Sequence, residues 1–219
     1  MHNKVYVLDT AELDDETLFD RWLGKMTSRR RQKIAAFRFD KDKRLCLGAG
    51  ILLAAAVQGG EKEPEYLVSE HGKPYFEDGR ICFNLSHSGT LAVCAVSDRE
   101  VGADVQQYRH FEDNLIRFVF QPGEVQRIYA CETPEQRDIL CTRLWTVKES
   151  IMKYLGTGIG LAPKKIRLDM NGAISAQCSD LSLEKLHFTH YQPDGCELTV
   201  CSEYGQFTDS LCTVSAKEL

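Results

Sequence analysis

The chain has 219 residues, with 27 basic and 32 acidic side chains and a net charge of −5. Hydrophobic residues make up 43% and charged residues 27% of it, which is the composition of an ordinary globular protein. The length fits one large domain or two small lobes, and the overall charge argues against a nucleic-acid-binding protein, which is usually strongly basic.

The first half of the chain predicts a strand, then helices, then further strands. Asp40 is placed as a helix N-cap, and Gly59-Gly60 ends that helix. In chain order, the expected elements are a strand at 5–8, a basic helix at 28–37, an apolar helix from Asp40 to Gly59, and strands at 81–83, 91–96 and 101–105.

Helical spacing returns from about residue 112, and the alternation typical of strands follows it. Thr133-Pro134 is a favourable helix start because proline is tolerated at the first helical position, and Gly156 ends the apolar helical pattern. Strands are expected at 166–170, 173–176, 186–191, 198–201 and 211–214, with a hairpin turn at Asn171-Gly172. This order predicts an α+β protein of two similar lobes, residues 1–105 and residues 106–219.

The average charge conceals one strongly basic segment. Residues 25–44 contain nine basic residues and only two acidic ones, so the segment is +7 and the remainder of the chain is −12. The negative overall charge therefore does not exclude a local basic site.

Nine cysteines are present, and neither their number nor their spacing suggests disulfides or zinc. The number is odd, no pair has CxxC spacing, and several lie in apolar runs, so reduced core thiols are expected. We find no signal peptide, and the longest apolar stretch, around 49–57, is too short to span a bilayer. We therefore expect a cytoplasmic protein without a membrane partner.

Two turn motifs in the first half could bind phosphate. Gly72-Lys73-Pro74 is a turn with a lysine, and Phe83-Asn84-Leu85-Ser86-His87-Ser88 runs from a strand into hydroxyl and imidazole groups. Each motif alone is weak, because a solvated surface turn is the simpler explanation of the first, and serine and asparagine commonly occur in strand-ending turns such as the second.

Two further motifs contain carboxylates. In Val101-Gly102-Ala103-Asp104-Val105-Gln106, the acidic residue interrupts an apolar strand and needs a partner or a metal, and Gln106 shares its face. In the helix 145–156, Glu149 and Lys153 lie one turn apart. A structural hydrogen bond and a surface ion pair are the alternative interpretations of these two motifs.

Together, in this order, the four motifs resemble the phosphopantetheinyl transferases of the surfactin-synthetase-activating type. The family pattern is GKP, FN-x-SHS, a G-x-D-x-E strand and a W/F-x-x-KE-x-x-x-K helix. This chain has GKP at 72–74, FNLSHS at 83–88, GADVQ at 102–106 and WTVKESIMK at 145–153. The resemblance covers essentially the whole chain.

The resemblance implies two pseudo-symmetric α+β lobes with the active site in the cleft between them. It implies an enzyme that uses coenzyme A and Mg²⁺ to move the phosphopantetheine arm to a serine of an apo acyl or peptidyl carrier protein. Adenosine 3′,5′-bisphosphate is released. A monomer is the simpler expectation for a chain that supplies both lobes.

The same resemblance assigns roles to particular residues. Asp104 and Glu149, with Gln106, would hold the metal, and Glu149 would also accept the proton of the carrier serine. Lys153 would stabilise the pyrophosphate, so that Glu149, Lys153 and Asp104 form the catalytic set. The side chains assigned to the coenzyme are Lys73, Ser86, His87, Lys148, Lys153, Arg30, Lys33 and Arg44.

One residue departs from the family pattern. Gln106 stands where the family has a second acidic residue, so one negative charge is lost although an amide oxygen remains. We expect weaker metal binding or an altered metal preference. A second hypothesis is a coenzyme A-binding module with impaired catalysis, and a third is a carrier-binding scaffold without coenzyme. Which carrier is served, and whether it docks at the loop 157–161, is not defined by the sequence.

Overall fold

The computed structural model describes residues 3–79, 81–169, 174–179, 181–203 and 207–219. Its internal contacts divide the chain into two compact units, each built of helices and strands, which agrees with the expected α+β class. The first unit comprises Met1–Val68, Pro74–Asp98 and Phe207–Leu219, and the second comprises Ser69–Lys73 and Arg99–Gln206. Among the described residues, no helix combines the length and apolar composition that a membrane crossing needs.

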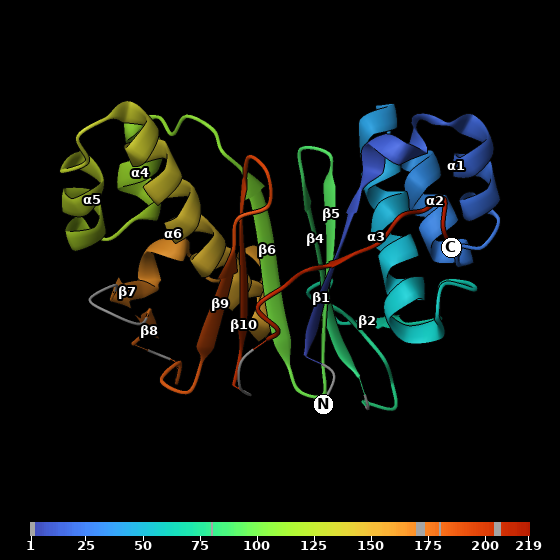
Figure 1. The fold of residues 1–219 in the computed structure, drawn as a ribbon. Helices are drawn as coiled ribbons and strands as arrows, with labels where there is room; N and C mark the ends of the chain where they lie inside the picture. Colours follow the sequence, from blue (N-terminus) through green and yellow to red (C-terminus); the bar gives the residue numbers. More distant parts are fainter. Residues whose placement is uncertain (1–2, 80, 170–173, 180, 204–206) are drawn as a thin grey trace. The chain divides into compact units, whose positions relative to one another are not determined.

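The first unit has four strands in one sheet, in the order β11-β1-β5-β4, with a separate β2-β3 pair (Figure 1). Its helical elements are η1 (Thr10–Asp14), α1 (Glu16–Leu23), α2 (Ser28–Ala36) and α3 (Asp40–Gln58). Its strands are β1 (Lys4–Asp9), β2 (Leu67–Val68), β3 (Pro74–Tyr75), β4 (Cys82–Ser88), β5 (Leu91–Ser97) and β11 (Cys212–Thr213).

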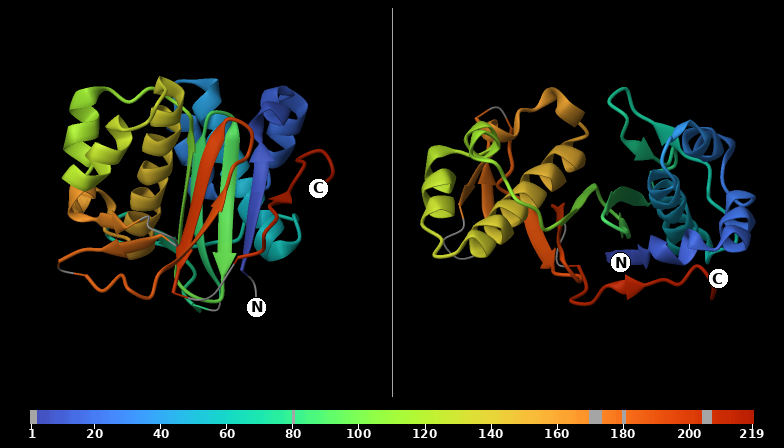
Figure 2. Two further views of the ribbon diagram at one scale, coloured as in Figure 1. Left: turned by 60° about the vertical axis from the view of Figure 1, so that its left-hand side comes forward. Right: turned by 90° about the horizontal axis from the view of Figure 1, so that it is seen from above.

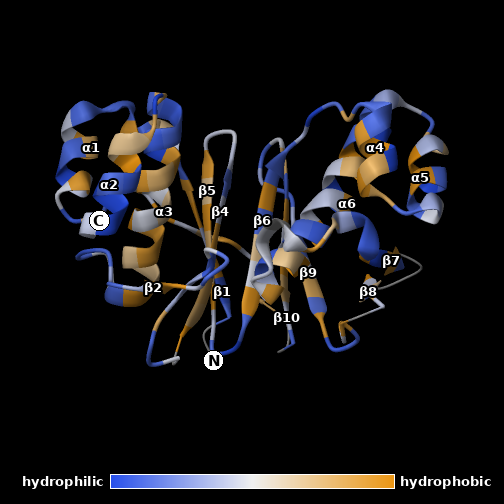
Figure 3. Ribbon diagram, turned by 180° about the vertical axis from the view of Figure 1, so that it is seen from behind, coloured by the Kyte–Doolittle hydropathy of each residue, from blue (hydrophilic) through white to orange (hydrophobic). Residues whose placement is uncertain are grey.

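Helix α3 packs along the first unit's sheet and supplies much of its core. In Figure 3 much of α3 has the hydrophobic colour, whereas α2 is largely hydrophilic, and only Arg30 and Ile34 of α2 are buried. The C-terminal segment returns to this unit (Figure 2). There Arg21 and Trp22 both donate hydrogen bonds to the Ala216 carbonyl.

The second unit has a three-stranded sheet in the order β6-β10-β9 and a β7-β8 pair. Its helical elements are α4 (Asp113–Val119), α5 (Pro122–Tyr129), α6 (Pro134–Leu155), η2 (Gly158–Gly160) and η3 (Pro163–Lys165). Its strands are β6 (Val101–Gln107), β7 (Arg167–Asp169), β8 (Ser175–Gln177), β9 (His187–Tyr191) and β10 (Cys196–Ser202). Helix α6 packs on β6 and β10 over a separate hydrophobic core.

The two units share one chain path. Leaving aside β11, each begins with a strand, continues through helices that end in one long helix, passes through a short strand pair, and closes with two further strands. In both, the last strand lies between the other two, as β1-β5-β4 and as β6-β10-β9, and all four pairings are antiparallel. This repeat of topology has no counterpart in a repeated sequence.

The contact division differs from the sequence boundary at 105/106, which cuts β6. That strand pairs with β10 along its whole length, from Val101↔Ser202 to Gln107↔Cys196, so it belongs with the second unit. The C-terminal residues group with the first unit because β11 pairs with β1.

Two local features go beyond the sequence predictions. Helix α1 lies between the predicted strand at 5–8 and the predicted helix at 28–37, where no element was predicted, and Asp15 caps it by accepting from the Thr17 and Leu18 amides. The predicted hairpin turn at 171–172 lies outside the described residues. All nine cysteines are free, as expected, and five of them are buried.

Candidate active site

The candidate site includes two polar side chains of β6. Asp104 and Gln106 are two residues apart and therefore project from the same face of the strand. The side chains of α6 that contact this sheet reach the same face, because Lys153 pairs with Asp104 and Thr146 hydrogen-bonds Thr199, the cross-strand partner of Asp104. Asp104 is only 6% exposed, so its charge is held in a place from which water is largely excluded.

Gly102 allows α6 to approach this strand closely. A Cβ atom at this position would lie 2.0 Å from the Ser150 carbonyl oxygen and 2.5 Å from the Tyr154 amide nitrogen. Only glycine fits this contact without displacing backbone. In this close approach of α6 to β6, Lys153 Nζ lies 2.6 Å from Asp104 Oδ1.

Glu149 lies one turn before Lys153 on α6, half-buried. Burial raises the pKa of the Glu149 carboxyl, and the nearby Asp104 carboxylate raises it further, while Lys153 acts in the opposite direction. Two carboxylates and one ammonium group therefore interact electrostatically at one place.

The donors at this place suit a magnesium ion. Among the described residues there is no group of three or more His, Cys, Asp and Glu side chains arranged to hold a metal. Magnesium, however, commonly takes one or two carboxylates and fills its other positions with water and substrate phosphate. Asp104 and Glu149 supply two carboxylates that repel each other, and a cation between them would relieve that repulsion. The amide oxygen of Gln106 is a third candidate ligand on the same strand face.

Lys73 joins the second unit at the C-terminal end of α6. Its ammonium group pairs with Glu100 and donates to the Tyr154 carbonyl oxygen at 2.6 Å. Gly72 makes the preceding turn with φ at 88°, a conformation that favours glycine. The Gly-Lys-Pro motif is therefore held at the end of the helix that bears Glu149 and Lys153.

Lys148 has a structural role that the sequence did not reveal. Its side chain is 0% exposed, its Nζ lies 2.8 Å from Glu124 Oε2, and it donates to the Ile166 carbonyl oxygen at 2.6 Å. Burial lowers the pKa of Lys148, and the charge of Glu124 offsets part of this by raising it. Although adjacent to Glu149 in sequence, Lys148 thus ties α6 to α5 and η3. Coenzyme binding by Lys148 stays a prediction, and these contacts do not favour it.

The Ser-His-Ser motif lies on β4 of the first unit. Ser86 is buried and His87 exposed, because neighbouring strand residues project to opposite faces. From the sequence we expected the Ser86 hydroxyl and the His87 imidazole to lie together, but on β4 they project to opposite faces.

The basic segment is divided among several tasks. Arg30 is 4% exposed; it pairs with the buried Glu63 at 2.5 Å and donates to the Cys46 carbonyl oxygen at 2.9 Å. Arg44 pairs with Asp14 at 2.7 Å, and Lys33 is exposed on α2. These contacts give Arg30 a structural role that was not foreseen, and its predicted contact with the coenzyme is not favoured by them.

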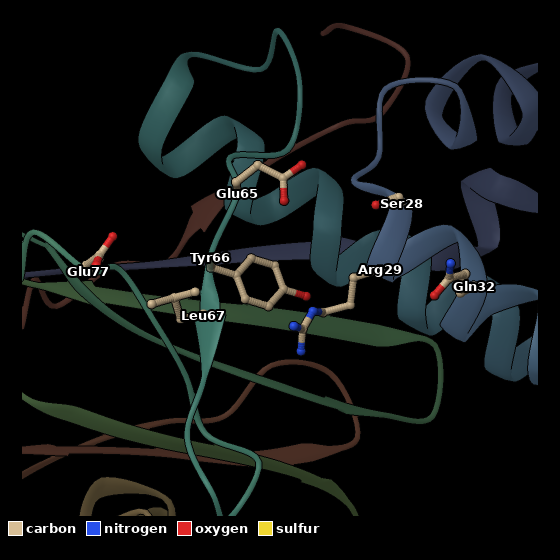
Figure 4. Close-up of a pocket in the computed structure, with 7 residues that line it drawn as sticks. All are labelled: Ser28, Arg29, Gln32, Glu65, Tyr66, Leu67 and Glu77. Carbon is tan, nitrogen blue, oxygen red and sulfur yellow. The ribbon is translucent and has the colours of Figure 1, made fainter.

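A cavity of about 700 Å³ lies in the first unit beside α2 (Figure 4). Arg29 and Tyr66 line it, and burial raises the pKa of Tyr66, while the charge of Arg30 and, more weakly, that of Arg29 act in the opposite direction. The remaining lining residues are Ser28, Gln32, Glu65, Leu67 and Glu77. The sequence pointed to this segment but to other residues in it, because periodicity alone did not show which basic side chains face outward.

Comparison with known proteins identifies the class to which this arrangement belongs. Residues 100–205, which contain Asp104, Gln106, Glu149 and Lys153, match the family model described as the 4′-phosphopantetheinyl transferase superfamily. The chain belongs to this superfamily, as its four motifs had predicted.

Individual relatives extend the similarity over most of the chain. A 4′-phosphopantetheinyl transferase of Bacillus subtilis is 28% identical over 207 residues, 91% of this chain and 92% of that protein. The 4′-phosphopantetheinyl transferase Sfp of Bacillus subtilis strain 168 is 26% identical over 208 residues, with the same coverage. The 4′-phosphopantetheinyl transferase AcpT of Salmonella typhimurium is 35% identical over 140 residues, 62% of this chain and 71% of that protein.

Proposed function

We propose that this chain is a 4′-phosphopantetheinyl transferase that moves the phosphopantetheine arm of coenzyme A to a serine of an apo carrier protein, with Mg²⁺ as the metal. The proposal rests on one observation above all. Asp104, Glu149 and Lys153 interact at one place, inside the segment that matches the superfamily. A coenzyme-binding module without catalysis would not need these three groups together.

Glu149 is the proposed base. The serine oxygen forms a bond to the phosphorus of the phosphopantetheine group while the pyrophosphate bond breaks, and adenosine 3′,5′-bisphosphate leaves. The serine proton moves to a Glu149 carboxylate oxygen. A serine hydroxyl needs such a positioned base, and a carboxyl whose pKa is raised toward the working pH is better suited to it.

Asp104, Glu149 and Gln106 are the proposed ligands of Mg²⁺, which when bound supplies charge neutralisation for the pyrophosphate. Lys153 adds a second positive charge at the same place, already held by Asp104. Phosphoryl transfer depends mainly on positioning and charge neutralisation, and this set of side chains provides both.

The coenzyme-binding residues are proposed on the family resemblance. Lys73 of the second unit, and Ser86, His87, Lys33 and Arg44 of the first, retain the phosphate-binding roles that the family resemblance implies. We assign Arg29 to the same ligand, because it faces a cavity that also offers the Tyr66 ring, a suitable surface for a purine base. Arg30 and Lys148 are assigned to maintaining the fold.

Intact-mass spectrometry tests the proposal. An apo carrier protein incubated with the chain, coenzyme A and Mg²⁺ should gain the mass of one phosphopantetheine group. Glu149→Gln should abolish this gain while coenzyme binding remains measurable by calorimetry. If several unrelated acyl and peptidyl carriers gain no mass, the transferase proposal is wrong; full turnover by the Glu149→Gln variant would refute the role of Glu149 alone.

A further inference from the structure

The neutral residue at position 106 has an acidic neighbour. In the antiparallel register Gln106 lies directly opposite Glu197 of β10, just as Asp104 lies opposite Thr199. Directly paired residues share one face of the sheet, with Cβ atoms about 4.5–5.5 Å apart. Glu197 is therefore the nearest cross-strand neighbour of Gln106.

Glu197 is a fully buried carboxylate held by several donors. It is 0% exposed and accepts from Gln192 Nε2 at 2.7 Å and from the Tyr108 hydroxyl at 3.1 Å. Both of its oxygens also face the Arg143 guanidinium of α6 at 3.3 Å. The pKa of Tyr108 is raised by burial and then by the Glu197 charge, which marks Glu197 as the source of a local negative field.

A carboxylate at position 106 would face this charge. The covered side of the sheet already has three acidic groups, Asp104, Glu149 and Glu197, against the two cations Lys153 and Arg143. Like charges directly opposite each other across an antiparallel pair are destabilising. An amide avoids that repulsion, and it has both a donor and an acceptor.

We infer that Glu197 and Gln106 form a coupled pair, in which Glu197 requires a neutral residue at 106 and orients its amide. With its amide oxygen on a cation held by Asp104 and Glu149, Gln106 would turn its NH₂ group toward Glu197, its partner in the register. Glu197 is in this sense a positioning residue for the metal site. The metal part of this inference rests on the proposed function, whereas the coupling between the two side chains does not.

A double-mutant cycle tests the coupling in metal-free protein. The four proteins are the wild type, Gln106→Glu, Glu197→Gln and the swap variant Gln106→Glu/Glu197→Gln, and the readout is thermal unfolding in EDTA. Glu197→Gln should lower the melting temperature when residue 106 is glutamine, because Arg143 loses its ion pair. It should raise the melting temperature when residue 106 is glutamate, because the repulsion disappears. An equal effect in both backgrounds overturns the coupling.

The swap variant also tests the connection to the metal. It has the wild-type net charge but places the carboxylate at 106, so a change in affinity cannot come from total charge. Calorimetry with Mn²⁺ alone should show binding about tenfold tighter than in the wild type, which corresponds to ~1.4 kcal/mol. Binding no tighter than in the wild type would show that residue 106 does not face the cation. A wild type that primes carriers while the cycle is additive would refute the pair and leave the proposed function intact.

Gln107→Glu is the matched control, since it makes the same chemical change one residue along β6, at a side chain that projects from the opposite face and is itself exposed. If Glu197→Gln does not fold, Gln106→Glu alone still decides. In EDTA it should melt below both the wild type and Gln107→Glu, and Mn²⁺ should restore more of its stability than of theirs. Equal melting temperatures for Gln106→Glu and Gln107→Glu would overturn the inference.

Discussion

Replacing Lys148 by methionine separates a structural lysine from a coenzyme-binding one. The side chain is 0% exposed and its ammonium group has three acceptors: Glu124 Oε2 at 2.8 Å, the Ile166 carbonyl at 2.6 Å and the Pro163 carbonyl at 3.2 Å. Methionine has a similar length and fills the space without these bonds. Lys148→Met therefore leaves Glu124 as a buried carboxylate without its counter-ion.

The expected cost follows from that burial. Removing one partner of a buried ion pair costs about 3–5 kcal/mol. Glu124 keeps two donors, the Gln121 and Leu168 amides at 2.9 Å each, so we expect the lower end, about 3 kcal/mol. For a chain of this length each kcal/mol shifts the melting temperature by about 2–4 °C. The loss should therefore be roughly 6–12 °C.

Chemical and thermal unfolding of three variants measures this cost. Lys148→Met should be much less stable than the wild type. Lys148→Met/Glu124→Gln should recover part of the loss, since the buried charge is gone and one amide oxygen still accepts a backbone bond. Affinity for coenzyme A, measured by calorimetry below the melting transition, should be nearly unchanged in the variants that fold.

The opposite pattern would refute this reasoning. In that pattern Lys148→Met melts within about 1 °C of the wild type, a change much smaller than that expected for a lost buried ion pair. If it then also loses coenzyme affinity severalfold, Lys148 binds the ligand as the family resemblance had implied. Failure of Glu124→Gln to improve the stability of Lys148→Met would separately exclude an energetically important pair.

Three other changes test the site and its framework. Because the folded protein raises the pKa of Glu149 from 4.5, ionisation of Glu149 costs stability that grows as the pH rises from the unfolded-state pKa through the folded one, so metal-free Glu149→Gln should melt higher than the wild type at pH 7. The difference should vanish as the pH falls toward 4, where both side chains are neutral, and a constant difference would contradict the pKa direction. Gly102→Ala should destabilise the protein by several kcal/mol because its Cβ would meet the Ser150 carbonyl; wild-type stability in urea would count against the close packing of α6 on β6. Arg30→Met should cost about 3–5 kcal/mol by exposing Glu63 to the interior without a counter-ion, whereas Lys33→Met, on the same helix but exposed, should leave the urea midpoint nearly unchanged; equal midpoints for the two variants would refute the structural role of Arg30.

Sequence patterns predicted most of the elements because their signals are local. The proline and cap at the start of α6 and the glycine at its end lie where the pattern placed them, with Thr133 accepting from the Gln136 amide and Gly156 at φ 66°. The long apolar helix α3 and the strands β4, β5 and β6 were equally clear. Helix α1 was not predicted because its apolar pattern is weak: only two of its side chains, Leu18 and Trp22, are buried.

The candidate site was predictable to a different degree in each of its parts. The i, i+2 spacing on β6 and the i, i+4 spacing on α6 indicated that Asp104 and Gln106, and Glu149 and Lys153, share faces, and motif order indicated the family. Which elements pair was not local information. Strand β6 pairs with β10, and its Asp104 contacts Lys153 of α6. These long-range contacts place Asp104, Glu149 and Lys153 in one unit.

By itself the sequence determined the residue types, their spacing along each element and, through four motifs in order, the superfamily. A charge count over residues 25–44 located a basic segment, but not which of its side chains are buried or paired. Tertiary structure alone decided that Arg30 and Lys148 are buried in ion pairs, and that Gln106 lies opposite Glu197. The physical reason is that burial and cross-strand register depend on contacts between residues far apart in the chain, whereas periodicity reports only which residues of one element share a face.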